Sequence, residues 1–262
     1  MNIAFHKYQG TGNDFILIAN RDKSIVLDRE QIAFLCHRRF GIGADGLMLL
    51  ENEAGYDFRM VYYNADGNES TMCGNGGRCI MAFAHSLGII KESARFIAID
   101  GGHTATIENG IVNLQMQDVK DIDATGERTI MNTGSPHYVQ WVDNVQATDV
   151  FNNGRSIRTA HSEKGINVNF VQKLADAIWV RTYERGVEDE TLSCGTGVTA
   201  SAIAASGDKL GSFTTAIHTP GGDLSVSFIK DSTTSATDVY LKGPAVFVYE
   251  GVVNVNEKLQ LK

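Results

Sequence analysis

The chain contains the pattern Glu-x-x-x-Cys-Gly-x-Gly twice, and this repeat is the feature that most constrains its fold. The first copy carries Cys73, and the second carries Cys194, 121 residues later. The similarity extends outward, so that residues 58–88 resemble residues 178–207. Each segment reads as an apolar strand, a polar turn, the cysteine, and a helix of small residues. Self-similarity of this kind is the signature of a duplicated structural unit.

A second pair of similar segments supports the duplication. Residues 10–20 (GTGNDFILIAN) resemble residues 134–144 (GSPHYVQWVDN), which aligns Phe15 with Tyr138. These segments occur in the same order as the cysteine segments and at nearly the same spacing. We therefore interpret the chain as two homologous halves.

The length of 262 residues suffices for one large domain or two of ordinary size. The repeat places the boundary near residue 119. The predicted halves are residues 1–118, which carry Cys73, and residues 119–262, which carry Cys194. The last strand, at about residues 252–262, is a candidate to return to the first half.

Most of each half reads as strands. Residues 103–117 alternate around Asn109-Gly110, the strongest short hairpin signal, and residues 223–251 contain strands separated by polar turns. Helices are expected at only three places: about 28–39, 74–87 and 195–206. The last of these is apolar or small on nearly all faces, which is typical of a helix buried all round.

These elements predict an α+β fold class. We expect two homologous halves related by a pseudo-two-fold axis. Each half is predicted to be a curved, mostly antiparallel β-sheet or barrel wrapped around a central helix, with a cysteine at the N-terminus of that helix.

The composition argues against several classes of protein. The chain is 43% hydrophobic and 21% charged, with a net charge of −8 at pH 7, so neither nucleic acid nor an anionic membrane is expected as its main partner. The N-terminal segment lacks the basic start and apolar core of a signal peptide, and no apolar run approaches the ~20 residues of a membrane-spanning helix. With four cysteines and no export signal, we expect a cytoplasmic protein with free thiols.

The motifs predict no cofactor and no metal. Cys73 and Cys79 are six residues apart, and no histidine cluster completes a zinc site. Residues 66–70 begin like a calcium loop, but Thr71 stands where that loop needs glycine. Residues 41–46 match Gly-x-Gly-x-x-Gly, yet they follow a helical pattern and precede a strand, the reverse of the order in a dinucleotide site.

The four cysteines fall into two groups. Cys36 and Cys79 occupy core-like helical positions and are interpreted as packing residues. Cys73 and Cys194 lie at helix N-termini, where N–H groups and the helix dipole favour a thiolate and can hold a carboxylate. Two such halves facing one another would place two thiols on opposite sides of one carboxylate substrate. One thiolate would remove the α-proton and one thiol would protonate the other face, which inverts a carbon centre without a cofactor.

At this point the residues resemble a known family, diaminopimelate epimerase, of the pyridoxal-phosphate-independent amino-acid racemases. The likeness covers essentially the whole chain and is carried by GTGNDFILI, FGIGADGL, YNADGNESTMCGNGGRC, GSPHYV, GINVNFVQ and YERGVEDETLSCGTG. The resemblance implies reversible conversion of LL- to meso-diaminopimelate in lysine and peptidoglycan precursor biosynthesis. It also implies an amino-acid substrate as the small-molecule partner, no cofactor, and a homodimer.

The resemblance further implies roles for individual residues. Cys73 and Cys194 correspond to the acid and the base, while which of them is the base in which direction stays open. His137 and Glu184 correspond to residues near the thiols that help to set their protonation. The residues that would hold the reacting carboxylate are Gly74, Asn75, Gly195 and Thr196. The residues that would line the rest of the pocket are Asn13, Asn64, Asn167, Glu184 and Arg185, with the Arg185 guanidinium and the amides gripping the distal amino-acid head.

The sequence departs from the family pattern at three places. Ser135 replaces the asparagine of a Gly-Asn-Pro-His motif, and Gly46 stands where many relatives have glutamine. The segment from Glu184 to Cys194 is one residue longer. These departures concern contacts with the substrate, and none alters a cysteine.

Three other functions stay open. Another cofactor-independent racemase, acting on proline or hydroxyproline, would use the same cysteines, but those substrates lack the second charged head that an asparagine and arginine set would bind. A cysteine hydrolase with His137 as the activating base explains only one of the two cysteines. An amino-acid binding protein would use the helix ends and would need no thiol.

Overall fold

The computed structural model describes residues 1–255, which form two compact units. Unit 1 is Met1–Leu114 together with the segment that begins at Pro244, and unit 2 is Gln115–Gly243. These units are defined by spatial contacts. The boundary near residue 119 is inferred from the sequence repeat and stays a prediction. The part of the expected last strand beyond Val255 lies outside the described residues.

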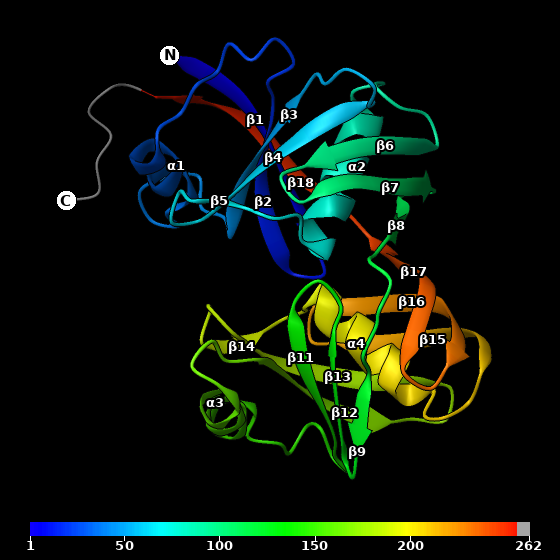
Figure 1. The fold of residues 1–262 in the computed structure, drawn as a ribbon. Helices are drawn as coiled ribbons and strands as arrows, with labels where there is room; N and C mark the ends of the chain where they lie inside the picture. Colours follow the sequence, from blue (N-terminus) through cyan, green and yellow to red (C-terminus); the bar gives the residue numbers. More distant parts are fainter. Residues whose placement is uncertain (256–262) are drawn as a thin grey trace. The chain divides into compact units, whose positions relative to one another are not determined.

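Unit 1 is a mostly antiparallel sheet that curves around one helix (Figure 1). Its strands are β1 (Asn2–Gly10), β2 (Asn13–Ala19), β3 (Gly46–Glu51), β4 (Phe58–Asn64), β5 (Glu69–Ser70), β6 (Ser93–Ala98), β7 (Gly101–Glu108), β8 (Ile111–Gln115, which ends at the unit boundary) and β18 (Val246–Asn254). The β2–β3 and β4–β6 ladders are parallel. The helix α1 (Arg29–Cys36) lies between β2 and β3, and α2 (Gly74–Ser86) lies between β5 and β6.

Unit 2 repeats this order of elements. Its strands are β9 (Asp123–Thr125), β10 (Arg128–Asn132), β11 (Pro136–Trp141), β12 (Asn167–Lys173), β13 (Ala177–Glu184), β14 (Asp189–Thr191), β15 (Gly211–Thr219), β16 (Gly222–Ser232) and β17 (Ser235–Pro244). The parallel ladders are β11–β12 and β13–β15, the counterparts of those in unit 1. The helix α3 (Val150–His161) follows β11, and α4 (Gly195–Ala205) follows β14. Strand β9 pairs with β10 as β18 pairs with β1.

The ladders also show which residues correspond between the units. Phe15 pairs with Gly46, the first residue of β3, and His137 pairs with Asn167, the first residue of β12. The counterpart of Phe15 is therefore His137, so the alignment of Phe15 with Tyr138 is wrong by one residue. The difference matters because a one-residue shift moves a strand side chain to the opposite face of the sheet.

The helices α2 and α4 are the central helices of the two units and confirm the predictions at 74–87 and 195–206. Helix α2 contacts β1, β2, β3 and β7, and α4 contacts β10–β13, β15 and β16. Most residues of α4 are buried, as its all-round apolar pattern predicts. Each sheet therefore fixes the position and direction of a cysteine-capped helix.

The two peripheral helices differ from expectation. Helix α1 starts at a capping box formed by Asp28 and Gln31 and ends at Cys36, three residues before the predicted end. Helix α3 is not predicted by the sequence pattern, because its Asn-Asn-Gly core has low helix propensity. Packing requires Gly154 there, since a Cβ at this position would lie 2.4 Å from the Cβ of Tyr183. Tertiary packing overrides local propensity in α3.

The strand predictions are confirmed. Residues 103–117 form the β7–β8 hairpin, and Asn109 (φ 51°) and Gly110 (φ 77°) take the left-handed conformations that a tight hairpin turn requires. Residues 223–251 fall in β16, β17 and β18. The α+β fold class is confirmed in each unit. Within residues 1–255, no helix has the length and apolar character needed to cross a membrane.

Candidate active-site cysteines

Cys73 is the N-cap residue of α2 and is partly buried. Its Sγ accepts a hydrogen bond from the backbone N–H of Gly76 at 3.2 Å. Gly76 permits this close approach, because a Cβ there would lie 3.0 Å from the Cys73 Sγ and 2.4 Å from Cε of Met48. A hydrogen bond donated to sulfur and a helix N-terminus both favour the thiolate form.

The predicted residues of the first turn of α2 form a directed chain of hydrogen bonds. Nδ2 of Asn75 donates to Oδ1 of Asn13 at 3.3 Å, and Nδ2 of Asn13 donates to Oδ2 of Asp45 at 2.6 Å. Gly74 is buried beside them. Unit 1 therefore brings Asn13, Gly74 and Asn75 together next to Cys73. Asn64 lies exposed at the end of β4, opposite Gly46 in the ladder.

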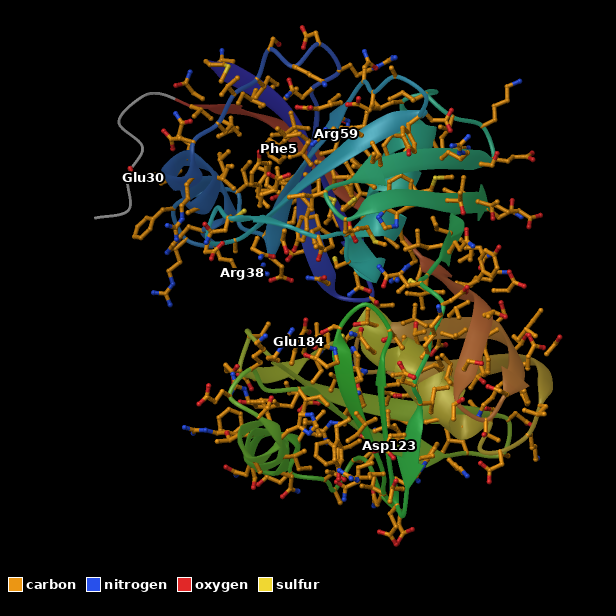
Figure 2. The ribbon with its side chains drawn as sticks, in the orientation of Figure 1. Phe5, Glu30, Arg38, Arg59, Asp123 and Glu184 are labelled. Carbon is orange, nitrogen blue, oxygen red and sulfur yellow. The ribbon has the colours of Figure 1, made fainter. Side chains whose placement is uncertain are left out.

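Asp45 is itself held by a group of charged residues. Arg38 donates to Asp45 at 2.7 Å and to both carboxylate oxygens of Asp14, at 2.7 and 3.0 Å. Arg38 lies on the segment after α1 (Figure 2). Burial of Asp14 opposes its ionisation, but hydrogen bonds from Arg38 and Lys7 outweigh burial and hold the pKa of this carboxyl below its usual range. Because Arg38 holds Asp45 and Asp45 accepts from Nδ2 of Asn13, this ion-pair group fixes the orientation of the Asn13 amide.

Cys194 is the N-cap residue of α4 and is buried. Its Sγ lies 3.5 Å from Oγ1 of Thr196, and that oxygen lies 2.8 Å from Nε2 of His137. Sulfur, hydroxyl and imidazole therefore form a continuous chain. Three predicted residues meet here, and Thr196 stands between the other two.

The proton of His137 is placed by Asn169. The Asn169 amide has a fixed orientation, because its Oδ1 accepts from Oγ1 of Thr182 at 2.9 Å and its Nδ2 donates to the carbonyl of Tyr138 at 3.1 Å. The same Nδ2 lies 3.1 Å from Nδ1 of His137, so Nδ1 accepts and Nε2 carries the proton. Nε2–H then donates to Thr196, which leaves the threonine hydroxyl hydrogen available for the sulfur of Cys194.

His137 is neutral in this network. The ring is fully buried, and burial, together with the positive charge of Arg185, lowers the pKa of His137 to about 3. A neutral imidazole with its proton on Nε2 acts as a hydrogen-bond donor to the threonine. Unit 2 therefore presents Cys194 to a polar but uncharged chain of side chains.

The remaining predicted residues of unit 2 surround Asn167. Nδ2 of Asn167 donates to Oγ of Ser135 at 2.8 Å, so the serine hydroxyl is part of this network. Oδ1 of Asn167 accepts from the backbone N–H of Arg185 at 2.9 Å, and Nη1 of Arg185 donates to the carbonyl of Lys164 at 3.3 Å. Glu184, labelled in Figure 2, is the last residue of β13. Its place in the ladder matches that of Asn64 in unit 1.

Two polar residues that are hydrogen-bonded to predicted site residues were not themselves predicted from the sequence. Asn169 lies in the segment GINVNFVQ. The one feature that could have indicated its role is that an amide occupies a position within an otherwise apolar strand. Arg78 lies in the quoted GNGGRC segment, and its signal was a charge within an otherwise apolar helix. Both are fully buried. Neither signal could be read without knowing which face of the strand or helix is inside.

The other two cysteines are buried in the cores of their elements. Burial raises the pKa of the Cys36 thiol to about 12 and raises that of Cys79 as well. Thiols of this kind behave as small apolar groups. In the described part of the chain, no three His, Cys, Asp or Glu side chains are grouped as metal ligands would be.

Solved structures share this fold. A Bacillus anthracis phenazine biosynthesis protein of the PhzF family superposes with a TM-score of 0.76 at 15% identity, covering 97% of this chain and 100% of that chain. A hydroxyproline epimerase from Agrobacterium vitis superposes with a TM-score of 0.70 at 14% identity, covering 99% and 94% of the two chains. The chain thus has the fold of this class of PhzF-like and racemase-like proteins.

Sequence comparison gives the family within that class. The model of the family described as diaminopimelate epimerase matches residues 5–120 and 129–248. A diaminopimelate epimerase from Flavobacterium psychrophilum is 53% identical over 257 residues, covering 95% of this chain and 99% of that protein. One from Methanocella arvoryzae is 40% identical, covering 97% and 98%. The chain belongs to the diaminopimelate epimerase family and is an enzyme of the epimerase class, as its motifs predict.

Proposed function

We propose that this enzyme interconverts LL- and meso-diaminopimelate, with Cys73 and Cys194 as the two acid/base groups and without a cofactor. The observation that carries the proposal is the duplicated site: in a chain of this family, each unit caps its buried central helix with a cysteine. One thiolate removes the α-proton, and one thiol delivers a proton to the opposite face of the same carbon.

The residues around each cysteine support this chemistry. An α-proton of an amino acid is hard to remove because the carbanion is unstable. Backbone N–H groups at the first turns of α2 and α4 can hold the reacting carboxylate, where negative charge develops. The residues assigned to this task are Gly74, Asn75, Gly195 and Thr196. Because these amides are fixed by the helices, they need no reorganisation during the reaction.

The distal head of the substrate is assigned to the polar side chains near the strand ends. Asn13, Asn64, Asn167, Glu184 and Arg185 supply amides, a carboxylate and a guanidinium. A guanidinium binds a carboxylate through two parallel hydrogen bonds. Polar groups that would be left unpaired beside a smaller substrate disfavour an amino acid that lacks the second head. This set favours diaminopimelate over proline or hydroxyproline.

His137 and Glu184 are assigned to the control of thiol protonation. His137 reaches Cys194 through the hydroxyl of Thr196, and its pKa of about 3 makes the imidazole a poor proton acceptor. His137 therefore supports the cysteine as a hydrogen-bond donor, whereas the base of a hydrolase must accept the proton of the thiol. This arrangement favours the epimerase over the cysteine hydrolase.

The deciding experiment is incubation with LL-diaminopimelate in deuterated water under reducing conditions. Deuterium at the α-carbon together with the meso isomer is the expected result, and the absence of both would contradict the proposal. L-proline and trans-4-hydroxy-L-proline are assayed in parallel. Faster exchange with either of these would assign the enzyme to the rival racemase reaction.

We also propose that the enzyme acts in the cytoplasm, in lysine and peptidoglycan precursor synthesis, as a homodimer. Large apolar side chains on β18 are between 43% and 69% exposed in the single chain, and a second copy would cover them: Val246, Phe247, Val248, Tyr249 and Val252. Val252→Lys should shift sedimentation toward the monomer. Val26→Lys, at a valine outside β18 that is 78% exposed, should not. A monomeric wild-type protein would overturn the dimer.

A further inference from the structure

Arg78 is a buried cation in the helix that Cys73 caps. It is 0% exposed and is the largest fully buried side chain among the described residues. Its guanidinium donates to four oxygens: the carbonyl of Gly74 at 3.1 Å, Oδ1 of Asn75 at 3.1 Å, Oγ1 of Thr11 at 3.2 Å and the carbonyl of Pro244 at 3.3 Å. Two of these acceptors belong to the residues that directly follow Cys73.

All four acceptors are neutral, and within residues 1–255 no carboxylate is in ion-pair range of Arg78. Apart from the exposed Glu108 at the end of β7, the other charged groups on the strands packed against α2 are in ion pairs. These pairs are His6–Glu250 at 3.1 Å on β1, Lys7–Asp14 at 2.8 Å between β1 and β2, Lys23–Glu51 at 4.0 Å at the end of β3, and His103–Asp100 at 3.3 Å at β7. On α2 itself, His85 lies in the last turn, far from the cap, and Cys79 is a buried thiol.

A buried cation without a carboxylate favours negative charge nearby. Burial lowers the pKa of Arg78, and a negative charge on the sulfur of Cys79 or Cys73 would raise that pKa. A guanidinium stays protonated in proteins, so Arg78 carries its charge at neutral pH. Because the interaction between two charges is mutual, the group that raises the pKa of Arg78 is itself favoured in its ionised form. Cys79 is fully buried, whereas Cys73 also accepts the N–H of Gly76.

The central helix of unit 2 has no counterpart of this charge. The cation near the Cys194 network is Arg185, which follows β13 and lowers the pKa of His137, and the neutral hydroxyl of Thr196 lies next to the sulfur of Cys194. The residue five positions after Cys194 is Thr199, which is fully buried and donates to the carbonyl of Gly195 at 2.9 Å. That bond corresponds to the bond from Arg78 to Gly74 in unit 1. The same backbone carbonyl is therefore satisfied by a cation under Cys73 and by a neutral hydroxyl under Cys194.

We propose that Arg78 is a positioning residue that holds the thiolate on Cys73 in the resting enzyme, so that Cys194 begins as the thiol. Its place in turnover rests on the proposed function. In that reaction the resting enzyme can react at once with the isomer whose α-hydrogen faces Cys73, because no proton has to move between the cysteines first. The proton moves from the α-carbon to the sulfur of Cys73, and the proton on Cys194 moves to the opposite face of the carbon, so the thiolate ends on Cys194.

The first test compares the two cysteines in the wild-type protein and needs no substrate. The reduced enzyme is alkylated with iodoacetamide at a series of pH values, and modification of each cysteine is followed separately by mass spectrometry. The pH at half-maximal rate, and not the rate itself, reports ionisation, so the different exposure of the two thiols does not confound it. Cys73 should titrate at least about one pH unit below Cys194. Equal midpoints, or a lower one for Cys194, would overturn the proposal.

The second test removes the charge. Arg78→Met should raise the Cys73 midpoint by about one pH unit or more, and Arg78→Lys should restore most of the difference because it keeps the cation. Thr199→Val is the matched control in unit 2 and should leave the Cys73 midpoint unchanged. A folded Arg78→Met protein with the wild-type midpoint would contradict the role of Arg78. If that variant does not fold, the lysine variant and the wild-type comparison still decide.

The outcome is independent of the assignment of substrate. A protein that fails to exchange diaminopimelate but shows an Arg78-dependent shift at Cys73 would refute the proposed function and keep this inference. A protein that epimerises diaminopimelate but whose two cysteines titrate at the same pH would support the proposed function and refute this inference.

Discussion

The two units share a backbone design but surround their cysteines with different chemistry. Both place a Cys-Gly-x-Gly turn at the start of a buried helix. In unit 1, the strand positions beneath that helix carry Phe15, Met48 and Tyr62, and the helix carries the charged Arg78. In unit 2, the corresponding positions carry His137, Asn169 and Thr182, and the helix carries the neutral Thr199. The charge lies in the helix of one unit, and a neutral polar network lies in the sheet of the other.

This difference shows what the duplication kept and what it changed. The helix N-terminus and the glycines were kept, because they are needed to hold a carboxylate next to a sulfur. The buried side chains diverged, and with them the electrostatic surroundings of the two thiols. A reaction that starts with one thiolate and one thiol needs such a difference, since identical surroundings would not favour either assignment.

The largest effect is expected from removing either cysteine. Cys73→Ala and Cys194→Ala should each lower epimerisation of diaminopimelate by about 10³-fold or more, because each removes one of two proton-transfer groups. The measurement is the rate of conversion followed by isomer separation. Cys79→Ala, on the same helix as Cys73, serves as the control and should keep most activity. Substantial turnover by either single variant would rule out a two-base mechanism.

The next effect concerns the hydroxyl that links Cys194 to His137. Thr196→Val should lower kcat by about 10²-fold, because it breaks the hydrogen-bond chain to the sulfur. Thr196→Ser retains the hydroxyl and should stay close to wild type. Wild-type kcat in the valine variant would show that unit 2 does not use this chain. Steady-state kinetics of both variants make the comparison.

The two glycines that follow the cysteines by three residues should differ in their tolerance of alanine. At Gly197 a Cβ would lie 2.3 Å from Oδ1 of Asn169, an amide held by three hydrogen-bond partners. At Gly76 the nearest atom is the flexible end of Met48. Gly197→Ala should therefore destabilise by about 3 kcal/mol and Gly76→Ala by about 1 kcal/mol. Urea unfolding measures both, and a larger loss for Gly76→Ala would contradict the view that the unit 2 network is the more rigid.

The last prediction is a pH dependence of stability between pH 7 and 5, which the buried His137 of unit 2 provides. In the unfolded chain His137 takes up a proton as the pH falls through its ordinary value near 6.5, whereas in the folded protein its pKa is about 3. The unfolded state therefore binds more protons, and stability is lost as the pH falls from 6.5 toward 3. At pH 5 this linkage costs about 2 kcal/mol.

His137→Gln tests this linkage, because glutamine does not titrate. The plot of the free energy of unfolding against pH between 7 and 5 should be flatter in this variant, whatever its stability at pH 7. Phe15 occupies the corresponding place in unit 1, so no equivalent slope is expected there. An unchanged slope in His137→Gln would show that His137 is protonated in the folded protein.

Much of the fold could be predicted because its signals are local or repeated. The Asn109-Gly110 turn and the helix of small and apolar residues after Cys194 can each be recognised from about ten consecutive residues. The duplication was readable because two long segments match in order. Helix α3 could not be predicted, because its Asn-Asn-Gly segment has low helix propensity. Packing against Tyr183 stabilises the helix in spite of this propensity. The counterpart of Phe15 was misplaced by one residue, because strand register follows pairing in the ladder and not residue type.

By itself the sequence determined that the chain is a duplication and that each copy sets a cysteine at a helix N-terminus, because both features rest on residue order alone. Only the tertiary structure decided how the cysteines differ. The tautomer of His137 depends on Asn169, which lies 32 residues away in the chain. The isolation of the Arg78 charge depends on four neutral acceptors drawn from residues 11 to 244. Burial and hydrogen-bond partners are properties of packing, and packing brings together residues that no local pattern connects.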